Sequence, residues 1–298
     1  MRVLVFGATG YVGSHVARNL YGCGYTVSGL ARTPAAAEKL QAAGIQPVFG
    51  DLDDIAGGVA LLEQADAVLF CPQLALEPEH AVVRAMLAAL AGTGKTFIFT
   101  SGTGVLSQRT DGAWSEDTFA EDDAFTPSKY VGFRCQTESI VRAAASTGVR
   151  AMVVRPPLIW GNGFNNVIKA IYDSAAKTGH ACYLGAGLNL YSNVHVDDLA
   201  DLYRLALERG VSGSLYHAVS GEANYRSMAE CVARELGTGT RSINFAQAQQ
   251  IWGNFLALIA FAMCSRSRCP RTRTELQWKP DAQRLDIMTE VANPVFRN

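Results

Sequence analysis

Three chemically active side chains lie four positions apart in the segment Ser128-Lys129-Tyr130-Val131-Gly132-Phe133-Arg134-Cys135-Gln136-Thr137-Glu138. If this segment is helical, Tyr130, Arg134 and Glu138 project from roughly one face. A phenol with a pKa of about 10 needs nearby positive charge to ionise at neutral pH, and an arginine one turn away supplies it. The spacing is compatible with either a solvated polar stripe or a general acid tuned by a cation.

A glycine-rich loop near the start of the chain is the second candidate for chemistry. Gly7-Ala8-Thr9-Gly10-Tyr11-Val12-Gly13 follows the strand-like run Val3 to Phe6 and leads into a helical pattern at Tyr11 to Tyr21. Small residues let the backbone approach a pyrophosphate, and the helix N-terminus favours the anion. In this strand-loop-helix context we expect a dinucleotide site, with an ordinary glycine turn as the alternative. The expected contacts are Gly7, Thr9, Gly10, Tyr11, Val12 and Gly13.

The end of the second predicted strand bears on the choice of cofactor. NAD sites usually place an acidic residue there for the ribose hydroxyls, whereas this chain has Leu30-Ala31-Arg32-Thr33. No carboxylate is present to repel a 2′-phosphate, and Arg32 offers a bidentate cation for one. NADP(H) is therefore favoured, with NAD(H) left open. After the third strand, Asp51 and Leu52 are expected at the adenine edge, with a helix N-cap as the alternative role of Asp51.

The elements that position these residues alternate through the first half of the chain. Strand-like runs occur at Val3 to Phe6, Thr26 to Leu30, Gln46 to Phe49, Ala67 to Phe70, Thr96 to Thr100 and Ala151 to Val154, with helical patterns between them. Strands separated by helices predict parallel pairing, and their continuous apolar character suits a sheet covered on both faces. The expected fold class is α/β, a Rossmann-type doubly wound parallel sheet.

The regular alternation of strand-like and helical patterns ends after Arg155. Turn-forming stretches follow, Pro156-Pro157, Gly161-Asn162-Gly163 and Gly185-Ala186-Gly187, before a helical pattern at Val196 to Leu207. We therefore expect a dinucleotide-binding domain at 1–155 and a smaller substrate-binding lobe at 156–298. No composition break separates them, so the two are expected to interlock as one structural unit.

Composition and charge restrict the partners. Of the 298 residues, 49% are hydrophobic and 18% charged, and the formal net charge is -1. The chain can bury a large core and has no overall attraction to nucleic acid or anionic lipid, so we expect a small-molecule substrate and neither a nucleic-acid nor a membrane partner. The seven cysteines are never spaced as CxxC, which argues against a disulfide framework and a zinc site. Without a signal-peptide pattern, a cytoplasmic location is expected.

One apolar segment, Ile251 to Cys264, could suggest a membrane span. It has about 14 residues where a span needs roughly 20, and Gly253 and Asn254 interrupt it. We expect a buried or interface helix that closes the substrate pocket or joins two copies of the chain.

Several motifs together resemble a known family. They are GATGYVG at 7–13, GDLDD at 50–54, FTSGTG at 99–104, YVGFRCQTE at 130–138, RPPLIWGNG at 155–163, NVHVDDLA at 193–200 and LQWKP at 276–280. The sequence resembles the extended or atypical short-chain dehydrogenase/reductases, a group also labelled NAD-dependent epimerase/dehydratase. The resemblance implies a Rossmann fold, a nicotinamide dinucleotide and, from family habit, a homodimer as one possible assembly.

The resemblance also assigns roles, with two departures from the family pattern. The family uses a tyrosine four residues before a lysine for proton transfer, and Tyr130 takes the tyrosine position while Arg134 takes that of the lysine. Arg134 keeps the charge but loses the compact ammonium that binds the nicotinamide ribose, because guanidinium is planar and essentially never deprotonated. The family's substrate-orienting hydroxyl falls on Gly102, so its neighbours Ser101 and Thr103 are the candidates. Pro156 is expected to contact the cofactor.

The remaining candidates surround the pocket expected at the carboxyl ends of the strands. The substrate-binding residues are expected to be Gln73, Trp114, Leu158, Phe164, Asn165 and Tyr191, with Leu74, Pro157 and Asn189 as further liners. Their apolar and aromatic character favours a small, rather hydrophobic substrate. His195 has no second ligand at metal spacing, so no metal is expected. It is interpreted as a structural histidine, with Asp197 or Asp198 as the N-cap of the following helix.

These observations favour an NADP(H)-dependent oxidoreductase that transfers a hydride between the cofactor and a carbonyl or alcohol. Two alternatives stay open. One is an epimerase, dehydratase or isomerase on the same fold without net cofactor turnover. The other is a catalytically impaired, NADP(H)-binding regulatory protein, which the residues at 102 and 134 favour and the retained Tyr130 disfavours.

Overall fold

A seven-stranded parallel sheet forms the centre of the computed structural model, which describes residues 1–297. Its strands are β1 (Arg2–Phe6), β2 (Thr26–Ala31), β3 (Gln46–Phe49), β4 (Ala67–Phe70), β5 (Thr96–Thr100), β7 (Arg150–Arg155) and β11 (Leu215–His217). Their order is β11-β7-β5-β4-β1-β2-β3, so the chain moves outward from β1 in both directions. The doubly wound Rossmann-type fold is confirmed, and the six predicted strands are right to within one residue at each end.

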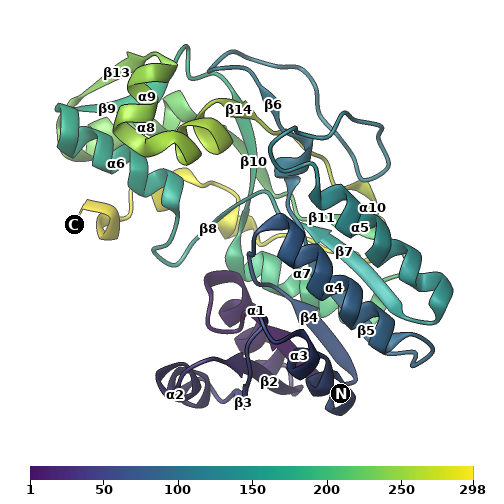
Figure 1. Cartoon of the computed structure of the whole chain (residues 1–298). Helices are drawn as coiled ribbons and strands as arrows, with labels where there is room; N and C mark the ends of the chain where they lie inside the picture. The colour runs from purple at the N-terminus through teal and green to yellow at the C-terminus, as the bar shows by residue number, and fades with distance from the viewer. Residues whose placement is uncertain (298) are drawn as a thin grey trace.

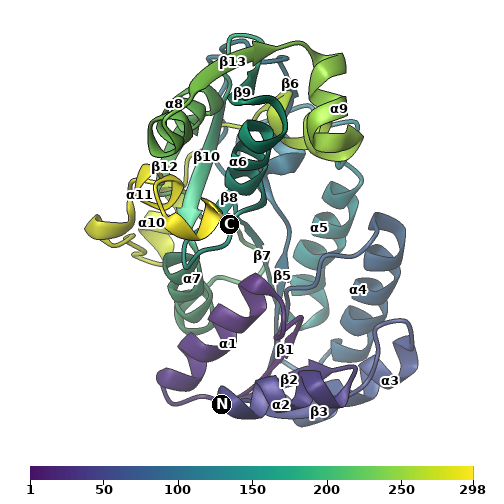
Figure 2. The same cartoon turned by 90° about the vertical axis from the view of Figure 1, so that its left-hand side faces the viewer.

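Helices cover both faces of this sheet because each strand presents apolar side chains alternately to either side. Val3 and Val5 pack toward α1 (Tyr11–Gly22), α2 (Pro34–Ala42) and α7 (Val196–Arg209). Leu4 and Phe6 pack toward the opposite layer, which contains α4 (Leu76–Leu90) and α5 (Arg134–Ala143) with the short α3 (Ile55–Ala60) beside them. Figure 2 shows the two layers on either side of the sheet.

A smaller lobe lies beyond the carboxyl ends of the strands (Figure 1). Its strands are β8 (Leu158–Trp160), β10 (Leu190–His195) and β12 (Gly221–Asn224) in one sheet, β9 (His180–Leu184) with β13 (Gly239–Ile243), and β6 (Gln108–Arg109) with β14 (Met263–Cys264). Its helices are α6 (Asn166–Thr178), α8 (Tyr225–Leu236), α9 (Phe245–Leu256), α10 (Pro270–Glu275) and α11 (Met288–Val291). The lobe has its own apolar core, centred on Ile171, Met228 and Phe261.

The two parts of the chain are interleaved. Helix α7 packs against α1, and β11 pairs with β7, although both follow residue 155. The second half therefore returns to complete the sheet and one of its helical layers. The division into 1–155 and 156–298 stays a prediction, and any such division has to treat α7 and β11 as parts of the sheet layer.

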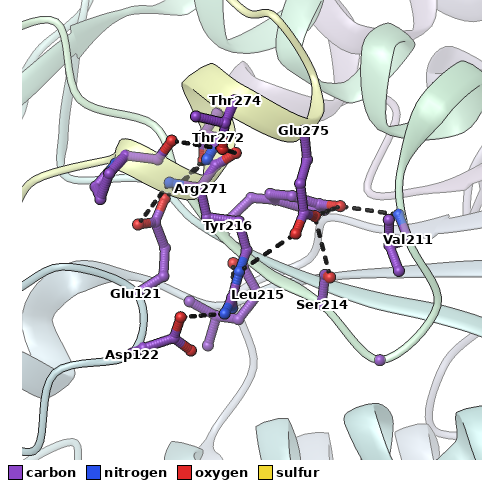
Figure 3. Close-up of polar contacts among 12 residues, drawn as sticks. Glu121, Asp122, Val211, Ser214, Leu215, Tyr216, Arg271, Thr272, Thr274 and Glu275 are labelled. Atoms are coloured by element: carbon purple, nitrogen blue, oxygen red, sulfur yellow. Dashed lines mark hydrogen bonds and ion pairs between the residues drawn. The ribbon is translucent and has the colours of Figure 1, made fainter.

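A group of polar contacts fastens the loop before α5 to the sheet edge (Figure 3). The buried Glu121 carboxylate accepts hydrogen bonds from the Thr272 backbone N–H, at 3.1 Å, and from the Thr272 hydroxyl, at 3.0 Å. Nearby, the Tyr216 hydroxyl on β11 donates to Glu275 at 2.8 Å, and Arg271 pairs with Asp122. The bonds of Glu121 and Asp122 hold the loop whose end leads to Tyr130.

The apolar segment at 251–264 is not the single helix expected from the sequence. Gly253 has φ of 79° and ψ of 160°, which interrupts α9. A π-helical turn follows at Ala257–Phe261, and the chain then enters β14. Glycine tolerates this positive φ without a steric penalty, so the interruption falls at that residue. No helix within residues 1–297 has both the length and the apolar character needed to cross a bilayer.

Candidate active site

The glycine loop between β1 and α1 has the geometry of a pyrophosphate cradle. Gly7 has φ of 78°, and a Cβ on Gly13 would lie 2.2 Å from the Gly7 carbonyl oxygen. Both positions therefore require glycine. The N-cap Gly10 provides no side-chain capping bond, so the first N–H groups of α1 lack intrahelical partners and are available to an anion. The residues present fit a bound dinucleotide.

A cleft of about 570 Å³ opens beside this loop. One wall consists of the glycine loop itself, through Gly7, Gly10, Tyr11, Val12 and Gly13, and the chain after β4 adds Cys71, Pro72 and Gln73. The opposite wall comes from the smaller lobe, through Pro157, Leu158, Ile159, Phe164, Asn165, Asn166, Val167, Tyr191, Tyr225, Ile259 and Ala260. The cradle and a largely apolar chamber are thus parts of one cavity.

The structure brings together most of the residues predicted for the substrate side. Gln73, Leu158, Phe164, Asn165 and Tyr191 all line the cleft. Both ends of the Asn165 side chain already form hydrogen bonds within the protein. Its oxygen caps α6 by accepting from the Val167 and Ile168 N–H groups, and its amide donates to the Ile159 carbonyl at 2.8 Å. The Phe164 ring lies 4.4 Å from that of Tyr11, so it connects the cofactor side of the cleft to the substrate side.

Trp114 and Pro156 lie away from the lining. Trp114 is 53% exposed and packs beneath the guanidinium of Arg266, 5.0 Å from the ring centroid. Pro156 is buried, and its carbonyl accepts a hydrogen bond from the Thr103 backbone N–H. Neither residue is among those that line the cleft, so their predicted contacts would require a rearrangement.

Residues missed by the sequence prediction come from distant parts of the chain. Cys71 and Pro72 directly follow β4, a position where the end of a parallel strand could have suggested them. Tyr225 reaches the cleft from α8, and no local pattern marks it as a liner because its position depends on how the smaller lobe folds back. Ile259 and Ala260 reach the cleft from the π-helical turn, so the apolar segment at 251–264 contributes to the pocket wall, which is one of its two expected roles.

The adenosine end of the predicted cofactor site is exposed. Arg32, just after β2, is exposed, and no hydrogen bond or ion pair from another residue in 1–297 occupies its guanidinium. Thr9, Asp51 and Leu52 also lie outside the cleft lining. Asp51 accepts a bond from the Asp53 N–H, while Asp54 is the N-cap of α3 and accepts from Gly57 at 3.0 Å. The N-cap interpretation of Asp51 is therefore wrong.

The three residues that share a helical spacing do not share a face. Helix α5 begins at Arg134, and Tyr130 lies in the turns before it. Arg134 donates to Glu79, and Glu138 accepts from Ser101 and Arg155. Because the helix starts four residues later than the spacing required, the predicted Tyr130-Arg134-Glu138 stripe does not form.

Tyr130 instead lies among basic side chains. Lys129 Nζ is 5.0 Å from the centroid of its ring. Desolvation raises the pKa of the phenol, but hydrogen bonds and charge from Lys129 and Arg109 outweigh it, and the net pKa is below the usual value. Cations therefore do tune this phenol, although Tyr130 does not line the cleft and Arg134 is not one of them.

The two predicted hydroxyls are buried and do not line the cleft. Ser101 donates to Glu138, which also forms a buried ion pair with Arg155. Thr103 is fully buried, and its carbonyl accepts a hydrogen bond from the Ser265 hydroxyl at 2.9 Å. Both side chains belong to polar networks that hold the segment after β5 in place.

His195 is a structural residue, as expected, but in a different way. Its Nδ1 accepts from the Asp197 N–H at 3.2 Å, so His195 itself is the N-cap of α7. Its ring packs edge-on against Trp160 at 4.8 Å. The prediction that Asp197 or Asp198 caps this helix is wrong, since both lie within its first turn. Residues 1–297 contain no group of three or more His, Cys, Asp or Glu side chains placed to hold a metal ion.

Comparisons with known proteins agree with the Rossmann-type fold. Residues 3–219 match the model of the NAD dependent epimerase/dehydratase family. The Schizosaccharomyces pombe Uncharacterized protein C2A9.02 is 32% identical over 309 residues, which cover 99% of this chain and 100% of that protein. The Stigmatella aurantiaca 4-hydroxy-2-methyl-3-oxo-4-farnesyl-3,4-dihydroquinoline-1-oxide ketoreductase is 28% identical, with 74% and 69% covered. The fold also matches that of the dTDP-glucose 4,6-dehydratase DesIV from Streptomyces venezuelae, solved with NAD and TYD bound, with a TM-score of 0.77, 20% identity and coverage of 99% and 96%.

Proposed function

Because the chain belongs to the NAD dependent epimerase/dehydratase family, whose members are enzymes of the extended short-chain dehydrogenase/reductase type, we propose that it is an NADP(H)-dependent oxidoreductase. Its substrate would be a small apolar compound that carries a carbonyl or an alcohol. The dinucleotide would supply or accept the hydride. The chain's own residues would bind both partners, orient them and exclude water.

The observation that carries this proposal is the continuity of the cleft. The glycine cradle and the walls formed by Leu158, Tyr191 and Ile259 border the same 570 Å³ cavity. Hydride transfer needs the two reacting carbons in contact, and a shared cavity supplies that proximity. A protein that only senses the dinucleotide has no need of the apolar chamber.

The lining supports the choice of an apolar carbonyl compound. No Asp, Glu, Lys or Arg is among the residues in 1–297 that line the cleft, whereas a phosphorylated substrate would call for cations at its phosphates. The Stigmatella aurantiaca relative is named as a ketoreductase of a farnesyl-bearing quinoline oxide. A hydrophobic ketone is therefore the first substrate class to try.

The preference for NADP(H) rests on Arg32. It follows β2 directly, its guanidinium is exposed, and the residues around it (Leu30-Ala31-Arg32-Thr33) include no acidic side chain. A 2′-phosphate can accept two parallel hydrogen bonds from such a group. For proton transfer, the family motif proposes Tyr130, with Ser101 or Thr103 polarising the carbonyl and Arg134 contributing charge. To reach the cleft, Tyr130 would have to move with the turns at 129–133.

The test is a stoichiometric assay with purified protein. A panel of aliphatic, aromatic and isoprenoid ketones is offered with NADPH or NADH, and product and oxidised cofactor are quantified together. One cofactor oxidised for each alcohol formed supports the proposal. Substrate turnover without net cofactor change would indicate an epimerase, dehydratase or isomerase. Tight cofactor binding without turnover of any compound would indicate a regulatory protein.

A further inference from the structure

Three tyrosines of residues 1–297 line the cleft, and the hydroxyls of two of them donate hydrogen bonds to backbone carbonyls. The Tyr11 hydroxyl donates to the Gly161 carbonyl at 2.7 Å, and the Tyr225 hydroxyl donates to the Ala260 carbonyl at 3.1 Å. Within residues 1–297, no carbonyl or carboxylate accepts a hydrogen bond from the Tyr191 hydroxyl, which instead has the Ser265 hydroxyl as its polar neighbour. Tyr191 is therefore the phenol able to donate to a ligand.

The backbone fixes Ser265 beside Tyr191. The two residues form a parallel β-bridge, in which the Ser265 N–H donates to the Leu190 carbonyl and the Ser192 N–H donates to the Ser265 carbonyl, both at 2.9 Å. Ser265 is fully buried, and its hydroxyl donates to the Thr103 carbonyl at 2.9 Å. The position of Ser265 next to the phenol is thus set by secondary structure and does not depend on a flexible side chain.

The Tyr191 phenol also lies where the family motifs converge. A Cβ built on Gly104 would be 3.7 Å from the Tyr191 hydroxyl and 3.7 Å from Val131. Gly104 belongs to the segment after β5 where the family places its substrate-orienting hydroxyl, and Val131 adjoins Tyr130. Tyr191 therefore brings a hydroxyl from β10 beside Gly104, two residues after Gly102, which takes the family's hydroxyl position.

We propose, building on the hydride transfer proposed above, that Tyr191 donates the proton to the substrate oxygen in the reductive direction. As the hydride adds to the carbonyl carbon, the Tyr191 O–H bond breaks and the proton passes to the oxygen, which gives the alcohol and a phenolate. The Ser265 hydroxyl can then turn from the Thr103 carbonyl to the phenolate and stabilise it. After the alcohol leaves, the phenolate takes a proton from solvent at the mouth of the cleft, and oxidation runs through the same steps in reverse.

The protonation state of Tyr191 suits a donor. Desolvation raises the pKa of the phenol, and the nearby Ser265 hydroxyl only partly offsets this. The group is therefore protonated at neutral pH and ready to donate a hydrogen bond. Transfer of the proton is driven by the alkoxide that forms as the hydride adds, because an alkoxide is a stronger base than a phenolate.

The experiment compares Tyr191→Phe with Tyr130→Phe, and uses Tyr21→Phe, an exposed phenol on α1, as a control. Three quantities are measured: kcat for ketone reduction, the Kd for the dinucleotide, and the Kd of the dinucleotide complex for an apolar amide that cannot be reduced. We expect Tyr191→Phe to lower kcat by at least about 100-fold and to weaken amide binding about tenfold through the lost hydrogen bond. The dinucleotide Kd should stay within about twofold, and Tyr21→Phe should match the wild type.

The readouts separate this proposal from the proposed function. If wild type reduces ketones and Tyr191→Phe keeps its kcat and its amide affinity, the role of Tyr191 is refuted and the oxidoreductase stands. If no ketone is reduced but Tyr191→Phe still loses amide affinity, the oxidoreductase fails and the hydrogen bond from Tyr191 stands. A large loss of kcat in Tyr130→Phe alone would indicate that Tyr130, and not Tyr191, donates the proton.

Discussion

Arg134 and Glu79 form a two-bonded ion pair between α5 and α4. Arg134 Nε lies 2.8 Å from Glu79 Oε1, and Nη2 lies 2.9 Å from Oε2. The Glu79 side chain is fully buried and that of Arg134 is 14% exposed. Burial raises the pKa of Glu79, even though the charge of Arg134 opposes this. The arginine at the family's lysine position therefore has a partner that depends on its planar, forked geometry.

Arg134→Ala should lower the free energy of unfolding by about 3–5 kcal/mol, because it leaves a buried carboxylate without its partner. Denaturant unfolding measures the change, and Arg18→Ala, at an exposed arginine on α1, should stay within about 0.5 kcal/mol of the wild type. The double variant Glu79→Leu/Arg134→Met should recover most of the loss, since apolar residues can replace a buried pair. A recovered stability with lost dinucleotide affinity would show that Arg134 also binds the cofactor, as the family motif predicts.

His217 should make the protein less stable in mild acid. Its buried ring lies between the Arg268 carbonyl, 2.9 Å from Nδ1, and the Arg155 guanidinium, 3.4 Å from Nε2. Desolvation and the charge of Arg155 lower the pKa of His217 from 6.5 to about 3. Between these values the unfolded chain binds a proton that the folded protein does not, so stability is lost as the pH falls.

The contribution of His217 can reach about 1.4 kcal/mol per pH unit. Unfolding free energies measured from pH 7 down to about pH 4 should therefore fall more steeply for the wild type than for His217→Gln, which keeps a neutral side chain. The same comparison for His15→Gln, at a half-buried histidine on α1, serves as the control. Equal slopes for wild type and His217→Gln would refute the assignment.

Gly13→Ala should damage the dinucleotide site. The new methyl group would lie 2.2 Å from the Gly7 carbonyl oxygen, which is backbone and cannot move aside cheaply. We expect dinucleotide affinity to fall by at least about tenfold, with a loss of stability of about 1–3 kcal/mol from overpacking. Gly22→Ala, also in α1, has no atom within 4 Å of its added Cβ and should leave both quantities near wild type. Calorimetric titration that showed equal affinities for the two variants would contradict the cradle geometry.

Arg32→Ala should reduce the preference for NADPH over NADH. The loss of charge-assisted hydrogen bonds to a 2′-phosphate corresponds to about 1.5–3 kcal/mol, or roughly a tenfold to hundredfold change in the ratio of the two dissociation constants. Binding of both cofactors is measured for each variant, with Lys39→Ala, an exposed cation on α2, as the control. A ratio that Arg32→Ala leaves unchanged would place NADP(H) specificity elsewhere.

The fold was largely predictable because its signals are local. Strand runs such as Ala67–Phe70 and Thr96–Thr100 are continuously apolar and are bounded by polar or turn residues, and both were located to the residue. The glycine loop was equally clear. A Cβ at Gly7 or Gly13 would lie too close to backbone atoms, so both positions must be glycine. β11, in contrast, has only three residues, Leu215–His217, and no alternation of its own by which to find it.

The site was less predictable where it depends on long-range packing. The spacing of Tyr130 to Arg134 predicts that Tyr130 is helical, but the helix begins at Arg134. Glu79, the ion-pair partner of Arg134, lies 55 residues away along the chain. Ser265, which pairs with Tyr191 through the backbone, lies in a distant segment of the chain. Spacing along one segment cannot reveal such partners.

We propose that this cleft carries a hydride between a dinucleotide and an apolar carbonyl compound. This proposal is tested most directly by supplying reduced cofactor deuterated at its hydride-donating carbon and analysing the product by mass spectrometry. The expected product is an alcohol with one deuterium on the former carbonyl carbon, formed in step with oxidised cofactor. A product formed without deuterium and without net cofactor oxidation would contradict it.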